Sequence, residues 1–221
     1  MSKRARKASG RVTQREGDGS MVRLLGRNTS GNVQKVIFLL EELGTPYTRE
    51  DYGRQFNNTQ DAAYLKLNPN GKVPTLVDGD TVIWESNTIL RYLASEHKKD
   101  ALYPTDPAAR TEVERWMDWL LAAVNYHYVQ VFKDSKKAAN ERAATFEADA
   151  KELAAQLSIL NGAMAGKAWI AGKDFTLADV ALGPIMHRCL DFPIALPALS
   201  NLKAWREKLK ERPAFRKATG A

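Results

Sequence analysis

A proline at the head of a strand-like segment restricts the fold of this chain more than any other feature. Pro74 lies in the run Val73-Pro74-Thr75-Leu76-Val77, although proline lacks the N–H that a β-ladder needs. A cis bond before Pro74 would turn the N–H and C=O of Val73 outward, where another peptide can pair with them as a further strand. The segment therefore predicts a sheet edge that binds an extended peptide.

A carboxylate site is predicted shortly after this edge. The hairpin pattern Asp78-Gly79-Asp80 leads to Trp84-Glu85-Ser86-Asn87, where Glu85 and Ser86 open a helix. The free N–H groups at a helix N-terminus favour a carboxylate. A peptide-binding edge beside such a helix end indicates a short acidic peptide as the ligand.

The chain divides into a mixed α/β part and a helical part. Residues 21–100 give the element order βαβ, then a short helix, then ββα. The proline-punctuated segment 101–107 is typical of a linker, and residues 108–221 show helical periodicity without a convincing strand. We therefore expect an α/β domain followed by an all-α domain. The expected strands are 22–25, 46–49, 73–77 and 81–84, and the later helices are about 108–132, 138–164, 177–190 and 199–209.

Much of the net charge of +7 lies at the N-terminus. Residues 1–20 hold six basic residues against two acidic ones, with almost no apolar side chains. We expect a disordered basic extension there, and an appended or misassigned N-terminus is favoured over a nucleic-acid arm. Between residues 203 and 217, Glu207 and Glu211 interrupt the basic residues, which indicates a solvated helix face and argues against nucleic acid as a partner.

The composition excludes several other classes of protein. The sequence has no run of about 18 apolar residues, so no transmembrane helix is expected. The N-terminus lacks the apolar stretch of a secretory signal, and the single Cys189 cannot form an internal disulfide, so we expect a cytoplasmic location. His97, His127 and His187 lack the spacing of metal ligands, so no metal site is expected.

The polar loop Asn28-Thr29-Ser30-Gly31-Asn32 joins the first predicted strand to the first predicted helix. Hydroxyl and amide donors at a helix start, assisted by the helix dipole, can stabilise an anion. If that anion is a thiolate, the same donors lower the pKa of the thiol. An ordinary helix N-cap is the alternative, because Ser, Thr and Asn are all preferred there. The loop by itself leaves both interpretations open.

Several spaced segments together resemble the cytosolic glutathione transferase family, in its bacterial theta-like, serine-type branch. The similarity runs over nearly all of residues 21–217. It implies a thioredoxin-like first domain, a helical second domain, glutathione as co-substrate and a homodimer. The segments that carry it are Arg27–Val36, Asn68–Pro74, Trp84–Asn87, Trp169–Gly172 and Phe175–Ala181.

The resemblance also assigns the residue that activates the thiol. It places the catalytic hydroxyl on Ser30, with Asn28, Thr29 and Asn32 as further candidates. The protein would need no nucleophile of its own, because glutathione supplies the sulfur. No cysteine occurs in this loop, which argues against the members of the family that form mixed disulfides.

The glutathione-binding residues follow from the same resemblance. Val73, held by Pro74, would pair its main chain with the cysteinyl part of glutathione. Ser86 would bind the γ-glutamyl carboxylate, and Glu85 would help to place the γ-glutamyl amine. The partners for the glycine carboxylate would be Lys72 or Gln55, whereas Arg54 is more typical of solvated surface charge.

The electrophile pocket is expected from the first loop and from the first helix of the second domain. The candidates are Arg27, Trp116, Tyr126 and Tyr128, although core packing is the default for a tryptophan at that spacing. A largely aromatic wall would suit an apolar electrophile.

The resemblance implies an enzyme that transfers glutathione to small electrophiles, by addition or by displacement of a halide, in a detoxifying role. One alternative is a glutathione-dependent disulfide or peroxide reductase. Another is a non-catalytic interaction module, as in transferase-like domains of translation complexes.

Overall fold

The computed structural model describes residues 21–221, so the basic extension expected at 1–20 lies outside the described residues. Its first part contains a four-stranded sheet in the order β2-β1-β3-β4. The central strand β1 (Val22–Leu25) runs parallel to β2 (Tyr47–Glu50) and antiparallel to β3 (Thr75–Asp78). The edge strand β4 (Thr81–Trp84) pairs with β3 across the predicted hairpin.

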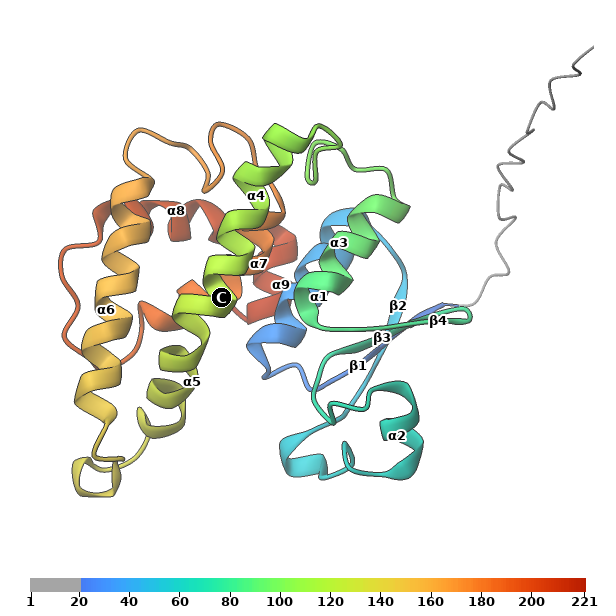
Figure 1. The fold of residues 1–221 in the computed structure, drawn as a ribbon, viewed down its shortest axis with the longest axis horizontal. Helices are drawn as coiled ribbons and strands as arrows, with labels where there is room; N and C mark the ends of the chain where they lie inside the picture. The colour runs from blue at the N-terminus through green and yellow to red at the C-terminus, as the bar shows by residue number, and fades with distance from the viewer. Residues whose placement is uncertain (1–20) are drawn as a thin grey trace, which may run out of the picture.

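Two helices cover the face of the sheet that meets the rest of the molecule, and a short helix lies on the other side (Figure 1). The covering helices are α1 (Gly31–Leu43) and α3 (Ser86–Glu96). Helix α1 ends at Gly44 because this residue adopts a φ of 65°, which glycine tolerates without a steric penalty. The 3₁₀ turn Arg54–Phe56 and the short α2 (Ala62–Leu67) precede β3.

The second part is helical, as the sequence predicts. A nearly continuous rod consists of α4 (Pro107–Trp119), a π-helical segment (Leu120–Val124) and α5 (Asn125–Asp134). The chain then forms a 3₁₀ turn (Ala139–Glu141), α6 (Phe146–Ala163), the largely buried α7 (Leu177–Cys189), α8 (Ser200–Lys210) and α9 (Pro213–Thr219). An α/β domain followed by an all-α domain is therefore confirmed.

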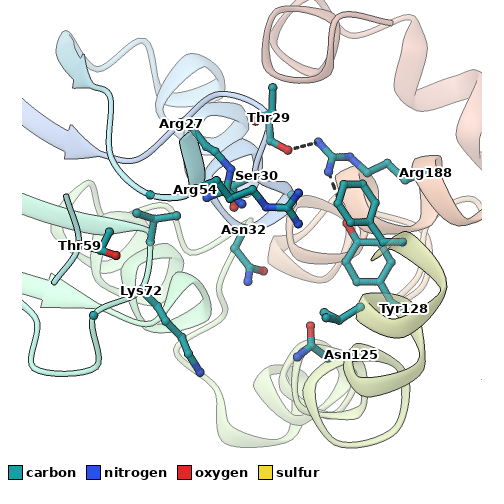
Figure 2. A pocket seen from close by; sticks show the side chains of 16 residues that line it. Arg27, Thr29, Ser30, Asn32, Arg54, Thr59, Lys72, Asn125, Tyr128 and Arg188 are labelled. Atoms are coloured by element: carbon teal, nitrogen blue, oxygen red, sulfur yellow. Dashed lines mark hydrogen bonds between the residues drawn. The ribbon is translucent and has the colours of Figure 1, made fainter. Parts of the chain in front are cut away.

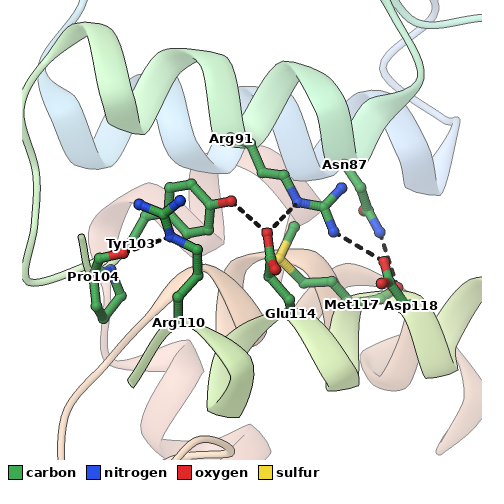
Figure 3. Close-up of polar contacts among 8 residues, drawn as sticks. All are labelled: Asn87, Arg91, Tyr103, Pro104, Arg110, Glu114, Met117 and Asp118. Atoms are coloured by element: carbon green, nitrogen blue, oxygen red, sulfur yellow. Dashed lines mark hydrogen bonds and ion pairs between the residues drawn. The ribbon is translucent and has the colours of Figure 1, made fainter. Parts of the chain in front are cut away.

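Polar side chains connect α3 to α4 across the junction between the two parts (Figure 3). The buried Asn87 donates from Nδ2 to the carbonyl of Met117, 2.9 Å away. Arg91 pairs with Asp118 at 2.9 Å and with Glu114 at 3.4 Å. These contacts fix the helical part beside the start of α3, where the carboxylate site is expected.

The helical part differs from the prediction at one helix boundary and by one additional helix. The helix expected to begin at Ala138 begins at Phe146, because Asp134 accepts a bond from the backbone N–H of Ala143 at 2.8 Å and holds the preceding segment as turns. Helix α9 was not anticipated, and it begins at Pro213 after the bend at Arg212. Across residues 21–221, no helix combines the length and the apolar character needed to cross a membrane.

Candidate functional site

The loop between β1 and α1 places Ser30 at the N-cap of α1, in the extended conformation typical of a cap. Its backbone C=O accepts from the N–H of Gln34 at 2.9 Å, as in a regular first turn. Among the described residues, however, the Ser30 hydroxyl caps no backbone N–H. Ser30 is 8% exposed and borders a cleft between the two parts of the chain, called the main cleft below. Its hydroxyl is therefore available to a ligand in that cleft.

The edge before β3 has the arrangement that Pro74 predicts. The Val73–Pro74 bond is cis, and within residues 21–221 neither the N–H nor the C=O of Val73 has a hydrogen-bond partner. The preceding residue is held firmly, because the carbonyl of Lys72 accepts from Tyr64 Oη at 2.6 Å and from Asn68 Nδ2 at 2.8 Å. A fixed strand end with free main-chain groups can pair with an extended peptide.

A small cavity of about 60 Å³ connects this edge to the start of α3. Ser86 is the first residue of α3 and is 3% exposed, while Glu85 before it adopts a φ of 71°. A positive φ is rare for a residue other than glycine and is concentrated at functional sites. The cavity is lined by Asn32, Asn68, Asn70, Lys72, Val73, Pro74, Glu85 and Ser86.

The main cleft, of about 280 Å³, adjoins this cavity and separates the two parts of the chain (Figure 2). The first part contributes Ser30, Asn32 and Val73 to its wall, and α5 contributes Asn125, Tyr128 and Phe132. The Oδ1 atom of Asn32 is buried without a hydrogen-bond partner among the described residues. The remaining residues of the wall are Arg27, Thr29, Gly31, Gly53, Arg54, Thr59, Gly71, Lys72, Val129 and Arg188.

Arg188 at the end of α7 connects the helical part to the first loop. Its Nη2 donates to the carbonyl of Thr29 at 3.0 Å and to Oε1 of Gln34 at 2.7 Å, and its Nη1 lies 3.5 Å from the phenolic oxygen of Tyr128. Burial raises the pKa of Tyr128, so its phenol stays protonated and can donate a hydrogen bond. A Cβ at Gly31 would lie 3.1 Å from that oxygen, so glycine permits this close approach.

Family comparisons agree with this geometry. A sequence model described as glutathione S-transferase, N-terminal domain, matches residues 21–95, and one described as glutathione S-transferase, C-terminal domain, matches residues 120–213. The glutathione S-transferase GstB of Escherichia coli is 37% identical over 201 residues, which cover 89% of this chain and 97% of the relative. The chain belongs to the glutathione S-transferase family.

Other relatives of this transferase span its full described length in the same way. Glutathione S-transferase 3 of Zea mays is 32% identical over 212 residues, covering 90% of this chain and 94% of the relative. A crystal structure of the theta class enzyme from Xanthomonas axonopodis pv. citri, with glutathione bound, superposes with a TM-score of 0.86 at 36% identity. That match covers 90% of this chain and 97% of the other. The first domain of this transferase is accordingly thioredoxin-like.

Most of the residues expected in the site meet at the two adjoining cavities. Ser30, Thr29, Asn32, Arg27 and Tyr128 line the main cleft. Lys72 and Val73 border both cavities, and Pro74, Glu85 and Ser86 border the smaller one.

Four expected site residues lie elsewhere in the transferase. Asn28 is exposed and borders a separate cavity of about 630 Å³, and Gln55 is exposed and borders neither of the two adjoining cavities. Trp116 packs against Trp119, with ring centroids 5.3 Å apart, because both rings face the interior of the helical domain. Tyr126 is 61% exposed, since its position on α5 turns it away from the wall that Tyr128 forms.

Sequence reasoning missed Arg188, Asn125 and Phe132 and treated Arg54 as surface charge. Arg54 is exposed, as a solvated charge would be, and it also borders the cleft, with Cζ 5.2 Å from the ring centroid of Phe132. No local pattern marks Arg188, because only the packing of α7 against α1 brings it to the first loop. A basic residue in the last turn of a helix is ordinarily explained by the helix dipole.

The described part of the transferase offers no cluster for a metal and no accessible thiol. Among residues 21–221, no group of three or more His, Cys, Asp and Glu side chains is placed to hold an ion. Cys189 is fully buried, and burial raises the pKa of its thiol, so the thiol stays protonated.

Proposed function

We propose that this transferase binds glutathione along the Val73 edge and transfers its thiolate to a small electrophile. The observation that carries the proposal is the uncommitted hydroxyl of Ser30, which borders the same cleft as the unpaired main chain of Val73. A peptide paired with Val73 would bring its cysteinyl side chain toward the start of α1.

Each end of glutathione has a proposed partner. The γ-glutamyl carboxylate would accept from the N–H and hydroxyl of Ser86 at the start of α3, and Glu85 would face the ammonium group. The glycine carboxylate would lie near Lys72, which borders both cavities, whereas Gln55 borders neither. These contacts hold the peptide extended and leave its thiol free to react.

Ser30 would then stabilise the sulfur as an anion. Its hydroxyl donates to the thiolate, and the N-terminus of α1 adds the positive end of a helix dipole. Both effects lower the pKa of the bound thiol, so its proton is released to solvent near neutral pH. The thiolate then attacks the electrophilic carbon, either adding to it or displacing a halide.

The test is the Ser30→Ala variant with glutathione and a chloroaromatic substrate. We expect kcat/KM to fall by roughly a hundredfold to a thousandfold, because one preorganised donor to the anion is lost. The pKa of bound glutathione, read from the pH dependence of kcat/KM for the chloroaromatic substrate at saturating glutathione, should rise. The dissociation constant for glutathione should change little, since the main-chain contacts at Val73 remain.

Asn28→Ala is the matched control, because Asn28 belongs to the same loop but borders the separate cavity. It should keep the activity of the unsubstituted protein. Equal rates for the unsubstituted protein and Ser30→Ala would refute the assignment of Ser30. Calorimetry that detects no glutathione binding at millimolar concentration would instead favour the non-catalytic module, and faster turnover of a glutathione-capped disulfide would favour the reductase.

The other expectations drawn from the sequence are proposals as well. They comprise a homodimer, a cytoplasmic location, a detoxifying role, and domains at 21–100 and 108–221 joined by the linker 101–107. Light scattering on the purified chain tests the dimer, and limited proteolysis tests the linker.

A further inference from the structure

Cationic side chains line the main cleft without acidic ones beside them. Arg27, Arg54, Lys72 and Arg188 border it, and no Asp or Glu side chain from residues 21–221 does so. None of the four forms an ion pair with another described residue. A cleft of this kind attracts anions.

Three of these charges are guanidinium groups held close together. Arg54 and Arg188 approach the ring of Phe132, with Cζ atoms 5.2 Å and 5.6 Å from its centroid, and Figure 2 shows Arg54 reaching toward Arg188. Burial lowers the pKa of Arg27, and the charges of Arg54 and Arg188 lower it further. The Nε atom of Arg27 is buried without a partner in the described part of the chain. A bound anion would reduce the electrostatic repulsion among the three guanidinium groups.

In the proposed complex, glutathione does not contact all of the cationic side chains of the cleft. Its two carboxylates have partners at Ser86 and Lys72, on the side of the cleft near β3. Arg188 instead comes from α7 and contacts the loop at Thr29, directly beside Ser30. The partners of its guanidinium, Thr29, Gln34 and Tyr128, are all uncharged. Its positive charge therefore stands next to the proposed position of the sulfur, where the second substrate must bind.

We propose that the electrophile carries a carboxylate, which Arg188 binds while Ser30 holds the thiolate. Both hydrogens of Nη2 are committed to Thr29 and Gln34, so the carboxylate would accept from Nη1, whose only contact is the phenolic oxygen of Tyr128 at 3.5 Å. Phe132 and Tyr128 supply the adjacent apolar surface. This substrate class replaces the apolar electrophile expected from an aromatic wall, because arginines occupy much of that wall.

For a short halocarboxylic acid, the reaction balances without any further reactant. The thiolate attacks the carbon that carries the halogen, the S–C bond forms, and the carbon–halogen bond breaks. The halide leaves with the bonding electron pair, and the thiol proton has already passed to solvent. This inference rests on the proposed glutathione transfer and specifies its second substrate.

Chloroacetate and chloroacetamide test the proposal, because they share a leaving group and differ in charge. Each kcat/KM, measured by chloride release, is divided by the rate constant of the uncatalysed reaction with glutathione. We expect this ratio to be about tenfold to a hundredfold larger for chloroacetate than for chloroacetamide, which is the range for a hydrogen-bonded ion pair. The preference should weaken as the salt concentration rises.

The Arg188→Gln variant should lose that preference through a higher KM for chloroacetate, with a smaller effect on chloroacetamide. Arg188→Lys should keep part of it, because the charge remains while the Nη1 donor and the bonds that position it at Thr29 and Gln34 are lost. Lys203→Gln removes the same charge from an exposed position on α8 and should leave both substrates unaffected. Calorimetry with glutathione checks that the variants keep the first binding site.

The outcomes separate this inference from the proposed function. Turnover of both substrates without a preference for chloroacetate, or a preference that survives Arg188→Gln, would overturn the carboxylate proposal alone. Absence of turnover with every electrophile, despite glutathione binding, would overturn the transfer reaction itself. If Arg188→Gln loses its fold, the salt dependence of the unsubstituted protein and the Arg188→Lys variant decide the matter.

Discussion

Lys35 shows how one residue on the buried face of α1 can control stability as the pH changes. It is 1% exposed, and burial lowers its pKa from 10.5 to about 7, although the charge of Glu85 opposes this shift. The unfolded chain therefore keeps a proton on Lys35 that the folded chain releases between about pH 7 and pH 10.5. The folded state binds fewer protons in this window, so the contribution of Lys35 to stability rises with pH.

We predict that Lys35→Met increases the free energy of unfolding most at or below about pH 7. Its advantage over the unsubstituted protein should shrink by about 1 kcal/mol per pH unit as the pH rises toward 9. Urea denaturation at a series of pH values measures this difference. Lys66→Met, at an exposed position on α2, should give no such trend. Parallel stability curves for Lys35→Met and the unsubstituted protein would contradict the prediction.

At the scale of elements, Asp179 ties three segments of the helical domain together. It accepts from the N–H of Thr176 at 3.0 Å and completes the capping box at the start of α7. It also accepts from the N–H of Ile170 at 3.0 Å and from Nε1 of Trp205 at 2.8 Å. These three bonds give Asp179 a structural role.

Asp179→Ala should lower the free energy of unfolding by about 3–5 kcal/mol, because it leaves several buried donors without an acceptor. Chemical denaturation followed by circular dichroism measures the loss. Asp174→Ala is the control, since Asp174 is exposed and its nearest cation, Lys173, is 4.0 Å away. Comparable losses for the two variants would show that the buried bonds of Asp179 contribute little.

Some of the strands and helix ends could be predicted from the sequence, and others could not. Strand β4 and the end of α1 follow from local signals, the Asp78-Gly79 turn and the left-handed Gly44. The late start of α6 does not, because the Ala-rich segment before it has good helix propensity and a carboxylate from α5 overrides that preference.

The residues of the candidate site show the same contrast between local sequence signals and packing between distant elements. Ser30, Val73 and Ser86 lie at element ends that the sequence marks with polar residues or proline, so they were predictable. Arg188 and Phe132 reach the cleft through packing between domains, which a local pattern does not encode. The residues proposed for the first substrate therefore carry a local sequence signal, whereas those proposed for the second substrate do not.

At the scale of the whole molecule, the two domains share a core. Phe38 of α1 is fully buried, and its ring lies edge-on to Phe215 of α9 at 5.3 Å and tilted against Phe175 at 5.8 Å. The ion pair between Arg212 and Glu42, at 2.6 Å, closes over the same junction. Because the first domain buries α1 against α7 and α9, we expect the domains to unfold together.

Phe38→Ala tests this cooperativity. The substitution should lower the free energy of unfolding by about 3–5 kcal/mol, the usual loss for a buried phenylalanine. Tryptophan fluorescence, to which the helical domain contributes four of the five tryptophans, and far-ultraviolet circular dichroism should shift by the same amount and stay coincident. Ile159→Ala, at a position that is 53% exposed on α6, should change stability far less. If the fluorescence transition stayed in place while circular dichroism shifted, the helical domain would be stable without α1, and the shared core would not couple the two domains.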